Sequence, residues 1–260
     1  MYVADAGKNA IYEIVRDRVY GQFLTLGSGF KKPTGVALDR RGDVFVADNG
    51  NNAIKEMLAV NGSIPPNPVI NTITTSIPNP YGVGVDIHKN IFVTNNSGSV
   101  VYEILAPDYK TINQLGSFTF PTSVAVDALA NVYVGTAAST SEVFEMLAPG
   151  YTTVQTLGGG NGEFLNPYGL AIDRSGKVYV ADYNNSAIKR MPPNCFSNSC
   201  VKTLTNQFYR PVGVAVDRSF NVYGTDVATG EVFEIVRAGG YTTIKVLANG
   251  FSTPWGIAVR

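Results

Sequence analysis

Oxygen-bearing side chains recur along the chain at intervals of 41 to 47 residues, each at the end of a short apolar run. They are Asp5, Asp48, Asn95, Thr136, Asp182 and Asp226. Carboxylate and amide oxygens are the ligands that Ca²⁺ and similar divalent cations take in proteins. If the runs meet around one axis, the four Asp residues and Asn95 form a candidate cation site. The alternative is that each side chain caps its own turn.

A second series of acidic residues opens turns of the type Asp-x-x-Gly or similar. Its members are Asp39, Asp86, Asp127, Asp173 and Asp217, and Arg260 stands in the sixth position. An Asp at the start of such a turn accepts hydrogen bonds from the backbone that follows it. We therefore assign this series a structural role.

Large aromatic side chains alternate with small ones at a third recurring position, directly after a proline. The six residues there are Thr34, Tyr81, Thr122, Tyr168, Val212 and Trp255. Aromatic rings with polar groups nearby can stack against a sugar, a planar ring or a partner side chain. We therefore predict a binding surface formed by Tyr81, Tyr168 and Trp255 with Thr34 and Thr122. The competing interpretation is that each aromatic residue packs on its neighbouring repeat.

Residues for acid–base or nucleophilic catalysis are scarce. His88 is the only histidine, and it lies in a turn away from the aromatic positions. A lyase that uses several histidines lacks them here, and a Ser-His-Asp triad is disfavoured because His88 has no serine within sequence reach. A hydrolase that activates water with a metal held by carboxylates alone remains an alternative. We therefore assign no catalytic residue.

The only two cysteines lie five positions apart in a polar loop. The sequence around Cys195 and Cys200 is Pro-Pro-Asn-Cys-Phe-Ser-Asn-Ser-Cys. We predict a disulfide between them, with two free thiols as the alternative, because a zinc site would need two further ligands. A disulfide implies an oxidising compartment, so we expect the protein to be exported.

The elements that carry these residues are short strands in a repeated unit. Apolar runs such as Val36-Ala-Leu and Val44-Phe-Val alternate with turn sequences, and prolines mark the units at positions 33, 80, 121, 167, 211 and 254. A period of 40 to 50 residues with several strands per unit is typical of propeller blades. We predict an all-β, six-bladed propeller with four strands per blade, forming one domain over residues 1–260.

The sixth unit is divided between the two ends of the chain. Pro-Trp-Gly-Ile-Ala-Val leads to Arg260, and the unit resumes at Met1 with Tyr-Val-Ala-Asp. We predict that the strand ending at Val259 pairs with the strand beginning at Tyr2. Such closure leaves no exposed terminal blade, so we expect a monomer. Because the chain begins inside a strand, we also expect its ends to be boundaries within a longer protein.

The composition excludes several classes of protein. Twenty basic residues balance twenty acidic ones, which disfavours nucleic-acid binding through a broad positive field. Lys8, Lys31 and Lys32 could form only a local basic patch. No apolar run is long enough to cross a membrane.

The repeated pattern Pro-x-Gly-Val-Ala-Val-Asp-x-x-Gly-Asn-Val-Tyr-Val-Ala-Asp, followed by Asn-x-x-Ile-x-Glu, resembles the NHL repeat over essentially the whole chain. The resemblance, closest to bacterial extracytoplasmic members, implies a six-bladed propeller. Members of the wider family are RNA-binding modules, protein-interaction domains and extracellular sensor domains of bacterial kinases. Related propellers are metal-dependent lyases and lactonases, so the fold does not name an activity.

We expect a non-enzymatic recognition module that presents one loop face to a protein or a glycan-like ligand and needs no cofactor. Two alternatives remain at this point. One is a lactonase-like enzyme with a divalent cation such as Ca²⁺ at the channel mouth, and the other is an RNA-binding NHL domain.

Overall fold

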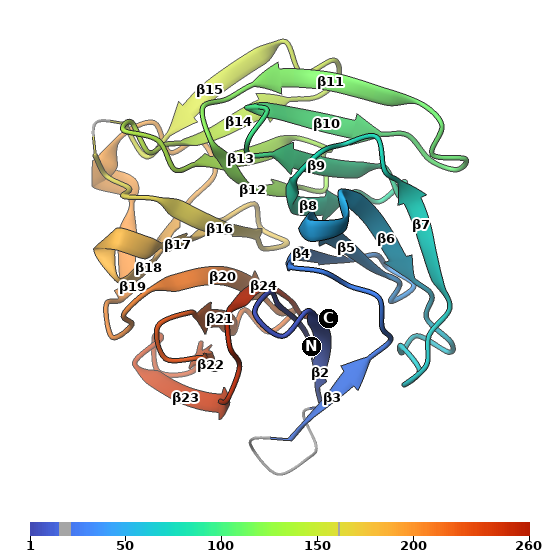
Figure 1. Ribbon diagram of the computed structural model, residues 1–260. Helices are drawn as coiled ribbons and strands as arrows, with labels where there is room; N and C mark the ends of the chain where they lie inside the picture. The colour runs from blue at the N-terminus through green and yellow to red at the C-terminus, as the bar shows by residue number, and fades with distance from the viewer. Residues whose placement is uncertain (16–21, 161) are drawn as a thin grey trace.

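The computed structural model describes residues 1–15, 22–160 and 162–260. Its strands form six antiparallel four-stranded sheets, arranged as blades around a central axis (Figure 1). The second strand of each blade, such as Val44–Asp48, is buried along its whole length, because its side chains point alternately to two faces that the neighbouring blades cover. The all-β, six-bladed architecture expected from the repeat is confirmed.

Each blade consists of four strands that follow one another from the central channel to the rim of the disc. In this order, blade 1 contains β24 (Pro254–Ala258), β1 (Tyr2–Asp5), β2 (Ala10–Ile14) and β3 (Phe23–Leu26), and blade 2 contains β4 (Pro33–Leu38), β5 (Val44–Asp48), β6 (Ala53–Met57) and β7 (Ile70–Thr74). Blade 3 contains β8 (Pro80–Val85), β9 (Ile91–Asn95), β10 (Val100–Ile104) and β11 (Ile112–Ser117), and blade 4 contains β12 (Pro121–Val126), β13 (Val132–Thr136), β14 (Val143–Leu147) and β15 (Thr153–Leu157). Blade 5 contains β16 (Pro167–Ile172), β17 (Val178–Asp182), β18 (Ala187–Met191) and β19 (Lys202–Thr205), and blade 6 contains β20 (Pro211–Val216), β21 (Val222–Asp226), β22 (Glu231–Val236) and β23 (Thr243–Ala248).

Helical structure in the described residues consists of three single turns: η1 (Asn49–Asn51), η2 (Tyr183–Asn185) and η3 (Asn198–Cys200). None of these has the length and apolar character that crossing a bilayer requires.

The two ends of the chain close the ring within blade 1. Strand β24 pairs with β1 in antiparallel register, Tyr2 opposite Ala258 and Val3 opposite Ile257. The two termini therefore lie side by side (Figure 1). This pairing confirms the closure predicted from the divided repeat.

Hydrophobic clusters fill the spaces between neighbouring blades. Between blades 2 and 3, for example, Phe45 and Ile54 pack against Val83 and Ile91, and all four are buried. The core is thus divided among blade interfaces, as expected for a repeat architecture.

Glycines near the start of the inner strands allow these strands to approach closely. A Cβ on Gly256 would lie 2.7 Å from the Thr34 carbonyl oxygen and 2.9 Å from the Val36 nitrogen, both in the next blade. Blade 4 has Ser123 at the same position, and its strand partner there is Gly135. Because Gly135 in β13 has no side chain, there is room for the side chain of Ser123 in β12.

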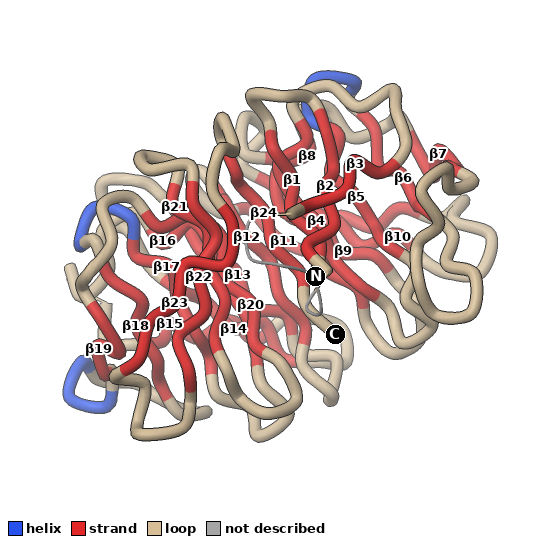
Figure 2. Tube along the Cα trace, turned by 90° about the horizontal axis from the view of Figure 1, so that it is seen from below, coloured by secondary structure: helices blue, strands red, loops and turns tan. Residues whose placement is uncertain are grey.

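The starts of all six inner strands lie at one end of the central channel and their ends lie at the other, so the strands run in the same direction. Figure 2 shows the loops that connect the strands at the two faces of the disc. In blade 2 the residue that follows Pro33 lines the cavity at one end of the central channel, and Leu38 lines the depression at the other end. The channel therefore has two mouths with different side chains.

The predicted disulfide is present. Cys195 and Cys200 are bonded to each other. The loop packs against blade 4, where the Gly158 amide donates a hydrogen bond to the Cys195 carbonyl at 2.7 Å. Cys195 is buried beside Leu157 and Phe164, so the bridge fixes a loop that covers the space between blades 4 and 5.

Candidate functional site at the channel mouths

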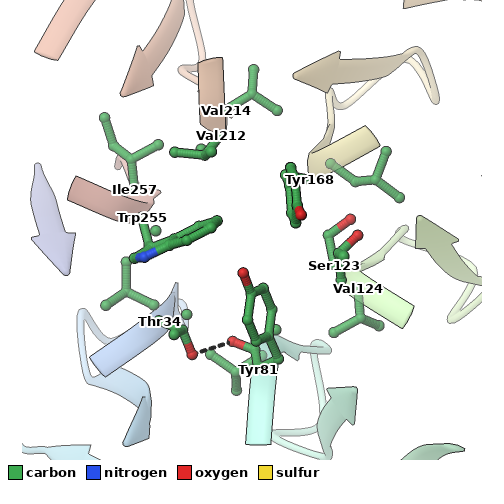
Figure 3. Close-up of a pocket in the computed structure, with 18 residues that line it drawn as sticks. Thr34, Tyr81, Ser123, Val124, Tyr168, Val212, Val214, Trp255 and Ile257 are labelled. Atoms are coloured by element: carbon green, nitrogen blue, oxygen red, sulfur yellow. Dashed lines mark hydrogen bonds between the residues drawn. The ribbon is translucent and has the colours of Figure 1, made fainter. Parts of the chain in front are cut away.

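Three aromatic side chains from alternate blades meet at the mouth where the inner strands begin. The ring of Trp255 lies 5.5 Å from that of Tyr81 and 5.4 Å from that of Tyr168, both in edge-to-face contact. Figure 3 shows the three rings pointing toward one another across the channel. All three are half-buried, so they close the mouth and still present surface to solvent. We call this surface the aromatic mouth.

The residues between the aromatic ones join neighbouring blades. The Thr34 hydroxyl donates to the Tyr81 carbonyl at 2.7 Å (Figure 3), and the Thr122 hydroxyl donates to the Pro167 carbonyl at 2.8 Å. Both threonines and Val212 are buried. Thr34 and Thr122 therefore line the cavity but use their hydroxyls to position the inner strands.

The cavity beneath the aromatic mouth is narrow, with a volume of about 60 Å³. Burial raises the pKa of Tyr81, as do the neighbouring phenols of Tyr168 and Tyr183. Burial likewise raises the pKa of Tyr168. Both phenols therefore stay protonated at neutral pH and can donate hydrogen bonds at the mouth.

The aromatic mouth extends outward through two residues that the sequence reasoning missed. The ring of Tyr183 lies 5.0 Å from that of Tyr168, and the Arg210 guanidinium lies 5.7 Å from the centre of the Tyr183 ring. Tyr183 occupies the place of Asn49 in blade 2, so a comparison of the second turns could have identified it.

A cation site in the first series would require several of its side chains to gather at one point. In the stretches of chain that the structure describes, no three acidic, histidine or cysteine side chains gather as a metal site would require. Asp48 accepts hydrogen bonds from the Lys31 amide and from Asn51, both at 2.7 Å, and its carboxylate lies 2.7 Å from the Lys55 ammonium.

Asp182 in blade 5 repeats this arrangement. It accepts hydrogen bonds from the Leu165 amide and from Asn185, both at 2.7 Å, and lies 2.9 Å from the Lys189 ammonium. Burial raises the pKa of Asp182 even though these hydrogen bonds and Lys189 lower it. The carboxylate thus joins the loop before the inner strand to the turn after the second strand.

The other members of the series cap loops in the same way. Asp5 accepts hydrogen bonds from the amides of Ser252 and Thr253, and Asp226 from the amides of Tyr209 and Arg210. Asn95 accepts one from the Gly98 amide at 2.7 Å. The capping interpretation describes the geometry of all five residues.

The acidic series at the opposite face also caps its turns, as predicted. Asp39 accepts hydrogen bonds from the amides of Arg41, Gly42 and Asp43, each at 2.9 Å. His88 lies in the equivalent turn of blade 3, exposed at this face and away from the aromatic mouth.

An ionic cluster lies between blades 2 and 3 at this face. The Lys89 ammonium lies 3.0 Å from the carboxylates of Asp43 and Glu56 and 3.3 Å from that of Asp39. Burial lowers the pKa of Lys89, but its hydrogen bonds to Glu56 and Asp43 outweigh this effect and raise it. Sequence reasoning did not predict this cluster.

Four arginines surround the channel mouth where the inner strands end. They are Arg40, Arg174, Arg218 and Arg260, from blades 2, 5, 6 and 1, and all are exposed. The floor of the depression is aliphatic. We call this surface the arginine mouth. Three of these arginines directly follow a turn Asp in aligned repeats, a signal that could have been read from the sequence.

A family model for the NHL repeat matches residues 30–56 and 164–191. These two segments contain the equivalent networks of Asp48 and Asp182. The chain is a six-bladed β-propeller with NHL-repeat segments. No curated protein gives a significant sequence match to it.

Solved structures with the same architecture match nearly the whole length of this propeller. A chain from a crystal structure of a nidogen–laminin complex superposes with a TM-score of 0.83 at 18% identity, covering 99% of this chain and 96% of that one. A streptogramin B lyase gives a TM-score of 0.68 at 14% identity, with 97% and 81% covered. Virginiamycin B lyase from Staphylococcus aureus gives 0.64 at 14%, with 95% and 80% covered. At such identities the likeness concerns the fold.

Proposed function

We propose that this NHL propeller is a non-enzymatic recognition module that binds a partner protein at the aromatic mouth. The observation that carries the proposal is the meeting of Trp255, Tyr81 and Tyr168, one from every second blade, in a half-exposed cluster. The repeat does not require aromatic residues there, because Thr34, Thr122 and Val212 occupy the same position in the other blades.

The residue types around the mouth suit a protein partner. Trp, Tyr and Arg are enriched among the residues that dominate binding energy at protein interfaces. The contacts from Trp255 through Tyr168 and Tyr183 to Arg210 form a continuous row of such residues. A propeller chain in a nidogen–laminin complex, similar in fold, supports the choice of a protein over a glycan.

The surroundings give less support to an enzyme or an RNA-binding domain. The carboxylates of Asp48 and Asp182 are each engaged by a lysine and by backbone or amide donors, which leaves them poorly placed to hold a catalytic cation. Lys55 and Lys189, which could have contributed positive charge to that face, are paired with these carboxylates. We infer export from the disulfide between Cys195 and Cys200.

A display library of random peptides selected on the immobilised protein tests the proposal, with a glycan array probed in parallel. Peptides that bind are titrated calorimetrically against the wild type, Trp255→Ala and the control Phe196→Ala. Phe196 is an exposed aromatic residue on the disulfide loop, outside the channel mouth. We expect Trp255→Ala to weaken binding roughly 10- to 100-fold, as for an anchoring interface residue, and Phe196→Ala to leave it unchanged.

Two outcomes would count against the proposal. Peptides that bind Trp255→Ala as tightly as the wild type would show that the aromatic mouth is not the binding surface. Glycans that depend on Trp255, in the absence of such peptides, would replace the protein partner with a carbohydrate. Thermal melting of each variant ensures that folded proteins are compared.

A further inference from the structure

We infer that the arginine mouth is a second binding site, for a small organic anion with an apolar body. It lies at the ends of the inner strands, whereas the aromatic mouth lies at their beginnings. The narrow channel between them means that one small ligand does not fill both. The inference is independent of the proposed function of the aromatic mouth.

The floor of this site is a ring of aliphatic side chains. Each inner strand contributes one at its end or directly after it, and all six are half-buried: Leu38, Val85, Val126, Ile172, Val216 and Val259. The depression has a volume of about 310 Å³, at the lower end of the range for small-molecule pockets. Removing an apolar ligand surface and this floor from water together would favour binding.

The rim provides cationic hydrogen-bond donors, and one of them, Arg260, already has a backbone partner. Within residues 1–15, 22–160 and 162–260, no ion pair engages any of the four arginines. The Arg174 guanidinium carbon lies over the Phe220 ring, 4.8 Å from its centre. A cation–π contact uses no N–H hydrogen bond, so this guanidinium can still donate to an oxyanion. Arg260 donates to the Gly62 carbonyl, which fixes its direction.

Acidic residues near the rim are turned toward their own loops. Asp86 accepts hydrogen bonds from the His88 and Asn90 amides, and Asp127 from the Leu129 and Asn131 amides. For Asp173, burial would raise the pKa, but hydrogen bonds from Ser175, Lys177 and Tyr179 lower it. Because these carboxylates accept hydrogen bonds from their own turns, the exposed arginine side chains are the charged groups that an approaching ligand meets.

The probe for the test is anilinonaphthalene sulfonate, which combines aromatic rings with one sulfonate. It is titrated into the folded wild type, Arg174→Gln, Arg218→Gln and the control Lys202→Gln, and binding is measured by its fluorescence and by calorimetry. Lys202 is exposed on the outer strand β19, so its substitution removes the same charge far from the mouth. Uncharged phenylnaphthylamine serves as the second ligand.

We expect one bound sulfonate per chain and about tenfold weaker binding for each arginine variant, equivalent to about 1.4 kcal/mol. Lys202→Gln and Trp255→Ala should bind as the wild type does. Phenylnaphthylamine should bind the wild type at least tenfold more weakly than the sulfonate.

Three results would overturn the inference. They are equal affinity of the wild type and both arginine variants, equal affinity for the charged and uncharged ligands, and loss of sulfonate binding in Trp255→Ala. The last result would place the probe at the aromatic mouth. Circular dichroism of the arginine variants, whose side chains are exposed, verifies that the fold is unchanged.

Discussion

The indole of Trp255 and the phenol ring of Tyr81, separated by 174 residues in the chain, lie 5.5 Å apart with their planes at 73°. This edge-to-face contact joins blades 1 and 3 across the channel. Both residues occupy the position after the repeat proline, and the fold makes them neighbours at the aromatic mouth. The relationship gives the aromatic mouth its shape and permits a direct test of its role.

Replacing Trp255 with alanine should cost less stability than removing a core aromatic residue. Trp255 is half-buried, and its two edge-to-face contacts account for about 1 to 3 kcal/mol. Phe45→Ala is the comparison, because Phe45 is fully buried and its truncation should cost about 3 to 5 kcal/mol. Urea unfolding measures both. Equal losses would make Trp255 a core residue rather than a binding residue.

Replacing Lys89 with methionine should destabilise the interface between blades 2 and 3. The substitution leaves the carboxylates of Asp43 and Glu56 without their shared cation, at a cost of about 1.5 to 3 kcal/mol. Lys110→Met is the matched control, because Lys110 pairs with Asp108 at 3.8 Å on the exposed surface. Such a pair contributes at most about 1 kcal/mol. Similar melting temperatures for both variants would refute the prediction.

Stability should fall as the pH rises above 10. Burial raises the pKa of eight tyrosines: Tyr2, Tyr12, Tyr81, Tyr109, Tyr133, Tyr151, Tyr168 and Tyr179.

Above the unfolded pKa of 10.0, the unfolded chain releases phenolic protons that the folded protein keeps. The linkage therefore favours unfolding as the pH rises. The melting temperature should decrease between about pH 8 and about pH 11. The decrease should be smaller for Tyr81→Phe than for the wild type, because the variant lacks one of these phenols. A melting temperature independent of pH over this range would contradict the prediction.

Replacing Gly256 with alanine should weaken the contact between blades 1 and 2. The new Cβ would lie 2.7 Å from the Thr34 carbonyl oxygen and 2.9 Å from the Val36 nitrogen. Overpacking of this kind costs about 1 to 3 kcal/mol. Ser123→Ala is the control, because blade 4 already accommodates a side chain at this position. The idea fails if Gly256→Ala melts at the wild-type temperature.

Opening the loop between Cys195 and Cys200 should destabilise the protein by about 2 kcal/mol, from the chain entropy regained in the unfolded state. The double variant Cys195→Ser, Cys200→Ser measures this loss by chemical denaturation. Alkylation followed by mass spectrometry should find no free thiol in the folded, non-reduced protein. Two modified cysteines would show that the bridge does not form.

The sequence alone determined the repeat, the strand pattern and the closure of the ring. These follow from local features: alternating apolar residues, turn residues at fixed offsets, and a unit divided between Arg260 and Met1. The pairing of Cys195 with Cys200 and the alternation of Tyr81, Tyr168 and Trp255 could also be predicted, because each depends on residue type and spacing within aligned repeats.

The tertiary structure decided which of these residues remain available to a ligand. Asp48 could have been a cation ligand or a cap, and the choice depended on the Lys31 amide and the Lys55 ammonium, which reach it from other segments. The same holds for the arginine mouth, where the turn carboxylates bind their own backbones and leave Arg174 and Arg218 outside any ion pair in the described chain. Spacing places a side chain on a face of the propeller, but its chemistry depends on the partners that neighbouring strands and loops bring within hydrogen-bonding distance.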